Sequence, residues 1–431
     1  MGNGNQLHGE FASFDIGTAA IGLLQLRLDP GVVAGGVFIE VALGEPLVVA
    51  VQIYNQFHVV APCINSAIAS SSLNDFELIV IDDGSTEQQL LKYLQYESNR
   101  GNITLLRNDS NMGFTRTVNR GMQLNPDRDV VLLNSDTLVY GDWAARLGAT
   151  ALSGADIATV NPLTNGSHIS GYPHRISSKN MNIGLDYLEL DNLAKERNSG
   201  ASAYVHATVG FCMYIRRKCI ESIGLFDDKH FPAGYGEESD FCARARKAGW
   251  RHKIDGGVHV AHLENQSFGD RKRLLMERMS RKITELHPDY ARYDKHFDVT
   301  DPVRPLRTGL DLARLRRLLA GKRELTVQSI DRRATAAAQG PSLAYRPLDQ
   351  TLSFAVDEGL HLPNLPRYIL PRDMLRLNSD MEYLGVERLG CATPAELARL
   401  QATVAPRSME TGLRPQLVIQ PQQSADRMRS G

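Results

Sequence analysis

Two short apolar segments of the chain each run into a cluster of acidic or polar residues, and a third acidic cluster follows a turn-rich stretch. Residues 78–81 lead into Asp82–Ser85, and residues 130–133 lead into Asn134–Asp136. The third cluster is Glu237–Asp240. Short apolar runs ended by turn residues are typical of buried parallel strands, and open α/β sheets bind ligands beyond the carboxyl ends of such strands. The pattern therefore predicts an α/β enzyme whose acidic rim suits a divalent cation and a phosphate-bearing substrate.

The pattern along the chain predicts four regions. Residues 45–292 repeat an apolar strand, a polar turn and an amphipathic helix, which is typical of a sheet covered by helices on both faces. Residues 1–44 alternate apolar and polar positions around a turn signal, so we expect a small β-strand appendage. Residues 293–404 are expected to form a mostly helical extension, and the Pro-, Gln- and Ser-rich residues 405–431 a disordered tail.

The composition excludes several classes of protein. A net charge of −1 gives no basic surface for bulk nucleic-acid binding, so we expect no nucleic-acid partner. Five scattered cysteines form neither a disulfide framework nor a zinc knuckle, and they fit a reducing cytosol as small buried apolar residues. The first residues lack the basic and apolar parts of a signal peptide. A cytoplasmic location is expected.

The basic segment Arg304–Arg323 has two interpretations. Leucines recur in it at helical spacing between arginines. Such a helix could lie on the anionic inner face of the plasma membrane, as a peripheral contact that brings the enzyme to a lipid-linked acceptor. Alternatively, its leucines pack against the catalytic domain.

Six motifs, in this order, resemble those of the inverting family-two glycosyltransferases, which have the GT-A fold. They are the strand and turn Val48–Asn55, the Asp-Asp-Gly-Ser-Thr turn 82–86, Asn111-Met112-Gly113-Phe114 with Asn119, Asn134-Ser135-Asp136, the segment 236–241 and His262. The resemblance covers residues 46–290. Asn134 stands where the family has the first aspartate of its Asp-x-Asp motif, a form similar to that of rhamnosyltransferase-like members. The resemblance implies a Rossmann-like mixed sheet with helices on both faces.

The resemblance also implies a nucleoside-diphosphate-sugar donor, such as a UDP- or dTDP-sugar, and a divalent cation, Mn²⁺ or Mg²⁺, held by Asp136 and His262. The residues expected to bind the nucleotide-sugar are Tyr54, Asn55, Asp82, Asp83, Gly113, Asn119, Asn134 and Ser135. Hard oxygen ligands suit either cation, and imidazole favours Mn²⁺. Two structural alternatives stay open, since Asp-Gly-Ser is common in turns and Asn134 could simply cap one.

The expected catalytic residues are Glu238, Glu237 and Asp240. Inversion needs one carboxylate beside the acceptor hydroxyl, and Glu238 is the predicted general base with Glu237 as its competitor. Adjacent residues of a helix point about 100° apart, so only one of the two can face the sugar. Asp240 is expected to position the acceptor or to cap the helix, and an acidic helix start can also serve only to offset the helix dipole.

These observations favour a metal-dependent transferase that passes a sugar to a hydroxyl of a glycan or lipid-linked glycan, in bacterial surface polysaccharide biosynthesis. The alternative is a catalytically silent relative that binds glycans or acts as a scaffold. A dehydrogenase is excluded, because Tyr54-Asn55-Gln56-Phe57 fills the place of a Gly-x-Gly-x-x-Gly turn. A nucleotidyltransferase would need a glycine-rich triphosphate loop near the first strand, and none is present there.

Overall fold

The computed structural model describes residues 47–175, 183–263, 269–329, 341–346, 348–356, 362–391, 394–395, 397–402 and 418–421. The strands expected in residues 1–44 lie outside the described residues. A compact unit begins at Leu47.

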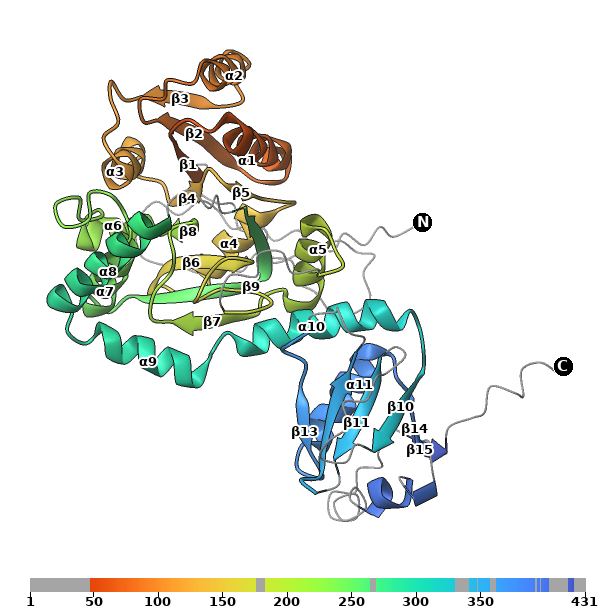
Figure 1. Cartoon of the computed structure of the whole chain (residues 1–431). Coiled ribbons are helices and arrows are strands. Elements are labelled where there is room, and N and C mark those ends of the chain that lie inside the picture. The colour runs from red at the N-terminus through yellow and green to blue at the C-terminus, as the bar shows by residue number, and fades with distance from the viewer. Residues whose placement is uncertain are drawn as a thin grey trace, which may run out of the picture. The chain divides into compact units, whose positions relative to one another are not determined.

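A nine-stranded mixed sheet forms the centre of this unit, in the order β3-β2-β1-β4-β8-β6-β9-β5, with β7 paired to β9 (Figure 1). Its strands are β1 (Leu47–Ile53), β2 (Phe76–Asp82), β3 (Thr104–Arg107), β4 (Val130–Asn134), β5 (Thr137–Leu138), β6 (Ile157–Thr164), β7 (Ser202–Val205), β8 (Cys212–Ile215) and β9 (Arg251–His262). The first four strands are parallel to one another, and β8 runs antiparallel to β4. The predicted Rossmann-like mixed sheet is confirmed.

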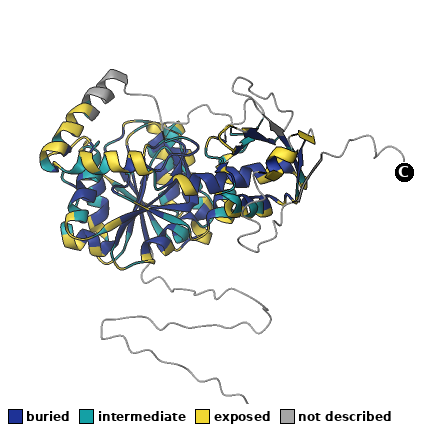
Figure 2. Cartoon of the chain, turned by 90° about the horizontal axis from the view of Figure 1, so that it is seen from below, coloured by how far each residue is buried: buried dark blue, intermediate teal, exposed yellow. Residues whose placement is uncertain are grey.

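Helices cover both faces of the sheet because side chains alternate along the buried strands. Val49 and Val51 of β1 pack against α1 (Phe57–Ser70), α2 (Gln88–Asn99) and α4 (Trp143–Leu152). Val48 and Ala50 face the side of α3 (Phe114–Leu124), α5 (Tyr187–Asn198), α6 (Arg217–Ile223) and α7 (Glu237–Lys247). The strands form the buried centre between these helices (Figure 2). Each fully buried valine contributes about 1.5–3 kcal/mol to folding.

A second, six-stranded sheet follows and corrects the expectation of a mainly helical extension for residues 293–404. Helices α8 (Gly269–Leu286), α9 (Tyr290–Thr300) and α10 (Arg304–Leu319) precede it, and α11 (Met374–Leu384) packs on it. Its strands are β10 (Glu324–Ser329), β11 (Ser342–Arg346), β12 (Thr351–Ala355), β13 (Arg367–Ile369), β14 (Arg388–Cys391) and β15 (Val418–Pro421). They are short, and the parallel partners β10, β14 and β15 lie far apart in sequence, so no local pattern marked them. Strand β15 also lies within the tail that was expected to be disordered.

Helix α10 is largely buried, which contradicts the membrane interpretation of Arg304–Arg323 and confirms the packing interpretation. Leu306 and Leu310 belong to the core beneath the first sheet, and Leu312 and Leu315 to the core of the second sheet. Its leucine face is therefore covered by protein. Within the part of the chain that the structure describes, no helix combines the length and apolar character that a membrane span requires.

All five cysteines are free and buried, as the sequence predicted. Burial raises the pKa of the Cys63 thiol to about 12, so this side chain behaves as a small apolar group.

Candidate functional site

The topology gathers many of the predicted site residues at one edge of the sheet. Strands β1, β2 and β4 are parallel, with Ile53 paired to Asp82 and Gln52 paired to Asn134, so their carboxyl ends lie together. Strand β8 starts at this edge, because Cys212 pairs with Leu133. Strand β6 runs antiparallel to β8, and β9 runs parallel to β6, so β9 also ends here. We call this side of the sheet the carboxyl edge.

Asp136 and His262 meet at the carboxyl edge although they are far apart in sequence. The distance between Asp136 Oδ1 and His262 Nε2 is 3.1 Å. Strand β5 brings them together, since Thr137 pairs with His262 and the Leu263 N–H donates to the Asp136 carbonyl oxygen over 2.7 Å. The His262 ring stacks on Phe211, with 5.5 Å between the ring centroids. The two predicted metal ligands therefore form one preassembled pair.

The donor set of this pair fits Mn²⁺ or Mg²⁺. Two ligands at right angles on an octahedral ion, each at about 2.1 Å, lie about 3 Å apart, which matches the Asp136–His262 spacing. The side chains of Asp136 and His262 are 23% and 14% exposed, so the pair is open to solvent on one side. No cluster of three such ligands occurs among the described residues, so the donor phosphates and water would supply the remaining positions.

The two buried carboxylates of the Asp82–Asp83 turn differ in their hydrogen bonds. Asp83 accepts hydrogen bonds from the Asn108 side chain, the Thr117 hydroxyl and the backbone N–H groups of Met112 and Gly113, at 2.7–3.0 Å. With these donors filling both oxygens, it joins the turn to the start of α3. That Asp83 binds the nucleotide stays a prediction, although its oxygens already accept these hydrogen bonds within the protein.

Asp82 remains a candidate for the nucleotide. Its Oδ1 accepts from the Ser85 N–H over 2.9 Å, whereas its buried Oδ2 makes no hydrogen bond within the described residues and lies 3.5 Å from Arg107 Nε. Tyr54, just after β1, is 45% exposed, whereas Asp82 is buried. In contrast, the Oδ1 of the Asn55 side chain accepts from the N–H groups of Thr86 and Glu87, which ties the β1 and β2 loops together.

Two predicted donor-binding residues, Gly113 and Asn119, hold α3 against the segment that precedes α7. Their role in binding the donor stays a prediction. The φ angle of Gly113 is 87°, and a Cβ here would lie 2.9 Å from the Pro232 carbonyl oxygen. Only glycine fits this position without strain. The Asn119 amide both donates to and accepts from the backbone of Phe226, at 2.9 and 3.1 Å.

Asn134 and Ser135 lie at the end of β4, half-buried at the carboxyl edge. Leu133 packs toward α1 and Leu132 toward α3 and α7, so alternation places the Asn134 side chain on the α3–α7 face. Its amide forms no hydrogen bond with the described residues, while its backbone oxygen accepts from the Thr137 hydroxyl. The side chain is thus available to a ligand.

The first turn of α7 carries two glutamates that converge on one backbone N–H. The Gly236 N–H donates to Glu237 Oε2 at 3.0 Å and to Glu238 Oε2 at 3.4 Å. Glu237 is buried, and burial together with the neighbouring Glu238 charge raises its pKa well above the ordinary value. Glu238 is only half-buried, and burial also raises its pKa. The pair can therefore hold a protonated Glu237 beside an ionised Glu238.

Asp240 is held by side chains of the protein itself, and its role among the catalytic residues stays a prediction. It is buried and accepts from Arg244 Nε at 2.7 Å, and its second oxygen lies 2.8 Å from His287 Nε2. Arg244 in turn donates to the backbone carbonyls of Ile223 and Leu225. Asp240 thereby fixes α7 to the end of α8 and to the loop after α6.

The direction of α7 brings its acidic start toward the carboxyl edge. The helix ends at Lys247, just before β9 starts at the opposite edge of the sheet, and the Cys242 carbonyl lies 3.1 Å from His252 Nε2 near that start. The segment that leads into β8 contacts both α7 and the Asp136–His262 pair. The Thr208 N–H donates to Cys242 Sγ of α7, and Phe211 stacks on His262.

Residues 48–224 match the model of the family described as glycosyl transferase family 2. The mycobacterial PGL/p-HBAD biosynthesis glycosyltransferase of Mycobacterium bovis is 31% identical over 91 residues, which cover 21% of this chain and 36% of the relative. Glycosyltransferase AglE of Haloferax volcanii is 21% identical over 203 residues, 47% of this chain and 62% of the relative. An uncharacterized protein, y4gI of Sinorhizobium fredii, is 22% identical over 60% of this chain and 29% of its own length. The chain thus spans about a third of the first curated relatives that it matches.

Solved structures with a similar arrangement include the mannosyltransferase PcManGT from Pyrobaculum calidifontis in complex with GDP-Man and Mn²⁺. It is 13% identical, with 63% of this chain and 71% of that chain covered and a TM-score of 0.40. GalNAc-T7 with UDP, GalNAc and Mn²⁺ is 17% identical, with 52% and 44% covered and a TM-score of 0.40.

Sequence analysis missed the residues that hold the Asp136–His262 pair in place. The Asn165 side chain accepts a hydrogen bond from the His262 backbone N–H at 2.7 Å and donates to the His262 carbonyl oxygen at 2.9 Å. Phe211 stacks on the His262 ring. A polar residue directly after the strand that ends at Thr164 was the available signal for Asn165. The Phe211 contact depends on the antiparallel pairing of β8, which no local pattern revealed.

Proposed function

We propose that this protein transfers a sugar, with inversion, from a nucleoside-diphosphate-sugar donor to a hydroxyl of an acceptor. The observation that carries the proposal is the Asp136–His262 pair, 3.1 Å apart at the edge where the parallel strands end. A divalent cation bound there would offset the charge of the departing diphosphate. Asp82, Tyr54 and Asn134 would contact the nucleotide and ribose from the same edge.

In this proposal Glu238 is the general base. It is the more accessible member of the Glu237–Glu238 pair, and its partner favours the protonated form. An ionised Glu238 can accept the acceptor hydroxyl proton as the oxygen attacks the anomeric carbon and the diphosphate leaves from the other face. Glu237 then acts as a positioning residue, with its proton directed to Glu238.

The pH profile tests this division of roles. Burial raises the pKa of Glu238, and a hydrogen bond from Glu237 lowers it. Activity needs ionised Glu238, so kcat/KM should fall as pH drops through that pKa. Glu237→Leu removes the donor but keeps the site apolar, and it should move this acid limb to higher pH. Glu237→Gln keeps a neutral donor, and its acid limb should stay in place. If both variants gave the same pH profile, the hydrogen bond from Glu237 would not set the pKa of Glu238.

For the acceptor we propose a hydroxyl of a glycan or lipid-linked glycan in bacterial surface polysaccharide biosynthesis, with a UDP- or dTDP-sugar as donor and a rhamnosyltransferase-like donor preference. Two observations support this choice. The Asn-Ser-Asp form of the motif 134–136 is similar to that of rhamnosyltransferase-like members. The mycobacterial relative is described as acting in PGL/p-HBAD biosynthesis.

A donor screen tests the function directly. Nucleoside diphosphate released from common sugar nucleotides should be measured with the full chain, with Mn²⁺, with Mg²⁺ and with a chelator. We expect release from one or a few donors, and its loss in the chelator. Metal-independent binding of nucleotides, or no binding at all, would instead favour the glycan-binding or scaffolding alternative.

A further inference from the structure

A cavity of about 580 Å³ has a lining that does not include Asp136 or His262. Tyr140, Ile183–Asp186, Tyr187 and Leu188 line it. Its volume is within the range of about 300–1,000 Å³ typical of small-molecule sites. Tyr140 follows Asp136 by four positions, so the chain between them spans at most about 14 Å. The cavity is therefore within a few sugar rings of the proposed transfer centre.

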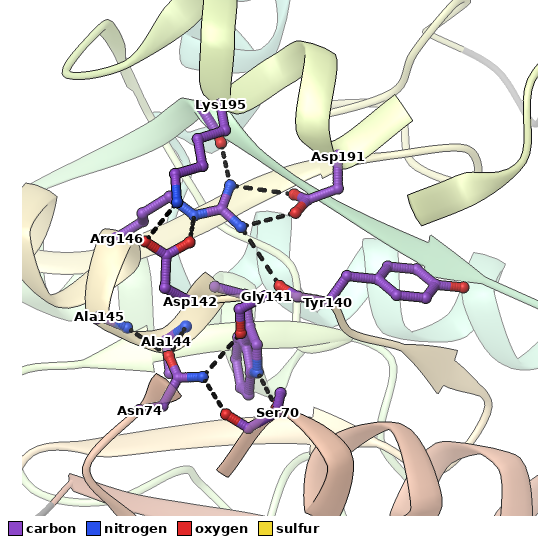
Figure 3. Close-up of polar contacts among 12 residues, drawn as sticks. Ser70, Asn74, Tyr140, Gly141, Asp142, Ala144, Ala145, Arg146, Asp191 and Lys195 are labelled. Carbon is purple, nitrogen blue, oxygen red and sulfur yellow. Dashed lines mark hydrogen bonds and ion pairs between the residues drawn. The ribbon is translucent and has the colours of Figure 1, made fainter. Parts of the chain in front are cut away.

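An ion-pair network holds the two tyrosine walls of this cavity together. Arg146 of α4 donates to both carboxylate oxygens of Asp191 on α5, at 3.1 and 2.7 Å. The same guanidinium donates to the Tyr140 carbonyl oxygen at 3.3 Å. A second link joins Lys195 to Asp142 at 2.9 Å. Figure 3 shows this network, with the Tyr140 ring pointing away from it. Tyr140 is thus fixed to the helix whose first residue is Tyr187.

Tyr187 presents a rigid aromatic surface. Its ring stacks on His259, with centroids 6.1 Å apart and planes 10° from parallel. The start of its helix is fixed by a capping box, in which Asp186 accepts from the Glu189 N–H at 2.8 Å. One side of the half-buried Tyr187 is therefore supported by protein, while the residue also lines the cavity.

The His259 ring that stacks on Tyr187 is uncharged. The residue is fully buried, and neither ring nitrogen has a hydrogen-bond partner among the described residues. Burial lowers its pKa to about 3, so the ring stays neutral at ordinary pH. Burying a histidine whose ring nitrogens lack hydrogen-bond partners costs free energy, and here the ring is held by aromatic contacts. Tyr172 contacts the His259 ring edge-on, so three aromatic rings lie together behind Tyr187.

We propose that this cavity binds a pyranose ring of the acceptor glycan, stacked on Tyr187, beyond the hydroxyl that receives the transferred sugar. The proposal rests on the transferase function proposed above. The apolar face of a pyranose stacks on an aromatic ring, and the half-buried Tyr140 and the exposed carboxylate of Asp186 can hydrogen-bond its hydroxyls. Leu185 and Leu188 supply further apolar lining.

Direct binding of glycosides to the full chain tests the proposal without any donor. Methyl glycosides of glucose, galactose, mannose, rhamnose and N-acetylglucosamine should be titrated and followed by saturation-transfer NMR. We expect at least one to bind, and Tyr187→Ala to weaken it by about tenfold or more, since aromatic stacking contributes on the order of 1 kcal/mol or more beyond area burial. Tyr187→Phe should retain most of the binding. Tyr96→Ala, at an exposed tyrosine on α2, is the matched control and should change nothing.

A second variant covers the case in which Tyr187→Ala unfolds. Leu188 is exposed at the cavity, so Leu188→Trp should fill the space and block glycoside binding without loss of thermal stability. Failure of every glycoside to bind, or unchanged binding in both variants, would overturn the proposal. These outcomes are separable from the transferase assignment. Loss of metal-dependent nucleoside diphosphate binding with glycoside binding intact would count against the transferase alone, and the reverse against the cavity alone.

Discussion

Glu238→Gln should lower turnover by about 10² to 10⁴, the usual contribution of a general base, while donor binding stays within about twofold of the native protein. The amide keeps the size of the side chain and can still accept from the Gly236 N–H, so the start of α7 should keep its shape. What is lost is the ability to take a proton. Nucleoside diphosphate release measures turnover, and calorimetry with the same nucleoside diphosphate measures binding.

Two matched variants make this result specific. Glu221→Gln alters an exposed glutamate on the preceding helix α6 and should leave both measurements unchanged. Glu237→Gln changes the neighbouring carboxylate and should cost much less turnover than Glu238→Gln. If Glu237→Gln proves the more damaging of the two, the base has been assigned to the wrong glutamate.

Strand order explains why Asp136 and His262 lie together. Both were predicted at or just after the end of an apolar strand, and the ends of β4 and β9 meet at one edge once the sheet is formed. Periodicity along the chain carries this information, because it fixes where strands and helices end. Glu238 was predicted from the resemblance of its motif and from the chemistry of inversion, and its role as general base stays a prediction.

The sequence could not show which acidic and amide side chains turn inward to the protein's own backbone. Asp83 looks like Asp82 in sequence, yet its donors come from Asn108 to Thr117. Asp240 looks like Glu238, but His287 and Arg244 occupy it. In each case the deciding partner comes from another loop or helix, and its approach depends on tertiary packing. The second sheet was missed for the same reason, because β10 pairs with β14 across a long intervening segment.

Asp136→Asn should abolish the metal dependence of nucleoside diphosphate binding. The variant keeps a polar side chain next to His262 but removes the negative charge that a divalent cation requires. Metal coordination at a diphosphate is worth several kcal/mol, so we expect affinity in Mn²⁺ to fall by about a hundredfold or more, to the level measured in a chelator. Calorimetry with UDP and dTDP, with and without Mn²⁺, checks this. His262→Ala should give a smaller loss that is greater with Mn²⁺ than with Mg²⁺, because imidazole suits Mn²⁺ better.

Asp109→Ala is the matched control, since this aspartate is exposed on the loop after β3 and should leave both metal titrations unchanged. Thermal unfolding without metal should be the same for Asp109→Ala and Asp136→Asn, because neither residue lies in a hydrophobic core. The decisive comparison is the ratio of affinities with and without Mn²⁺. A ratio in Asp136→Asn equal to that of the native protein would mean that the cation is held elsewhere, and the Asp136–His262 pair would then be only a hydrogen-bonded link between β5 and β9.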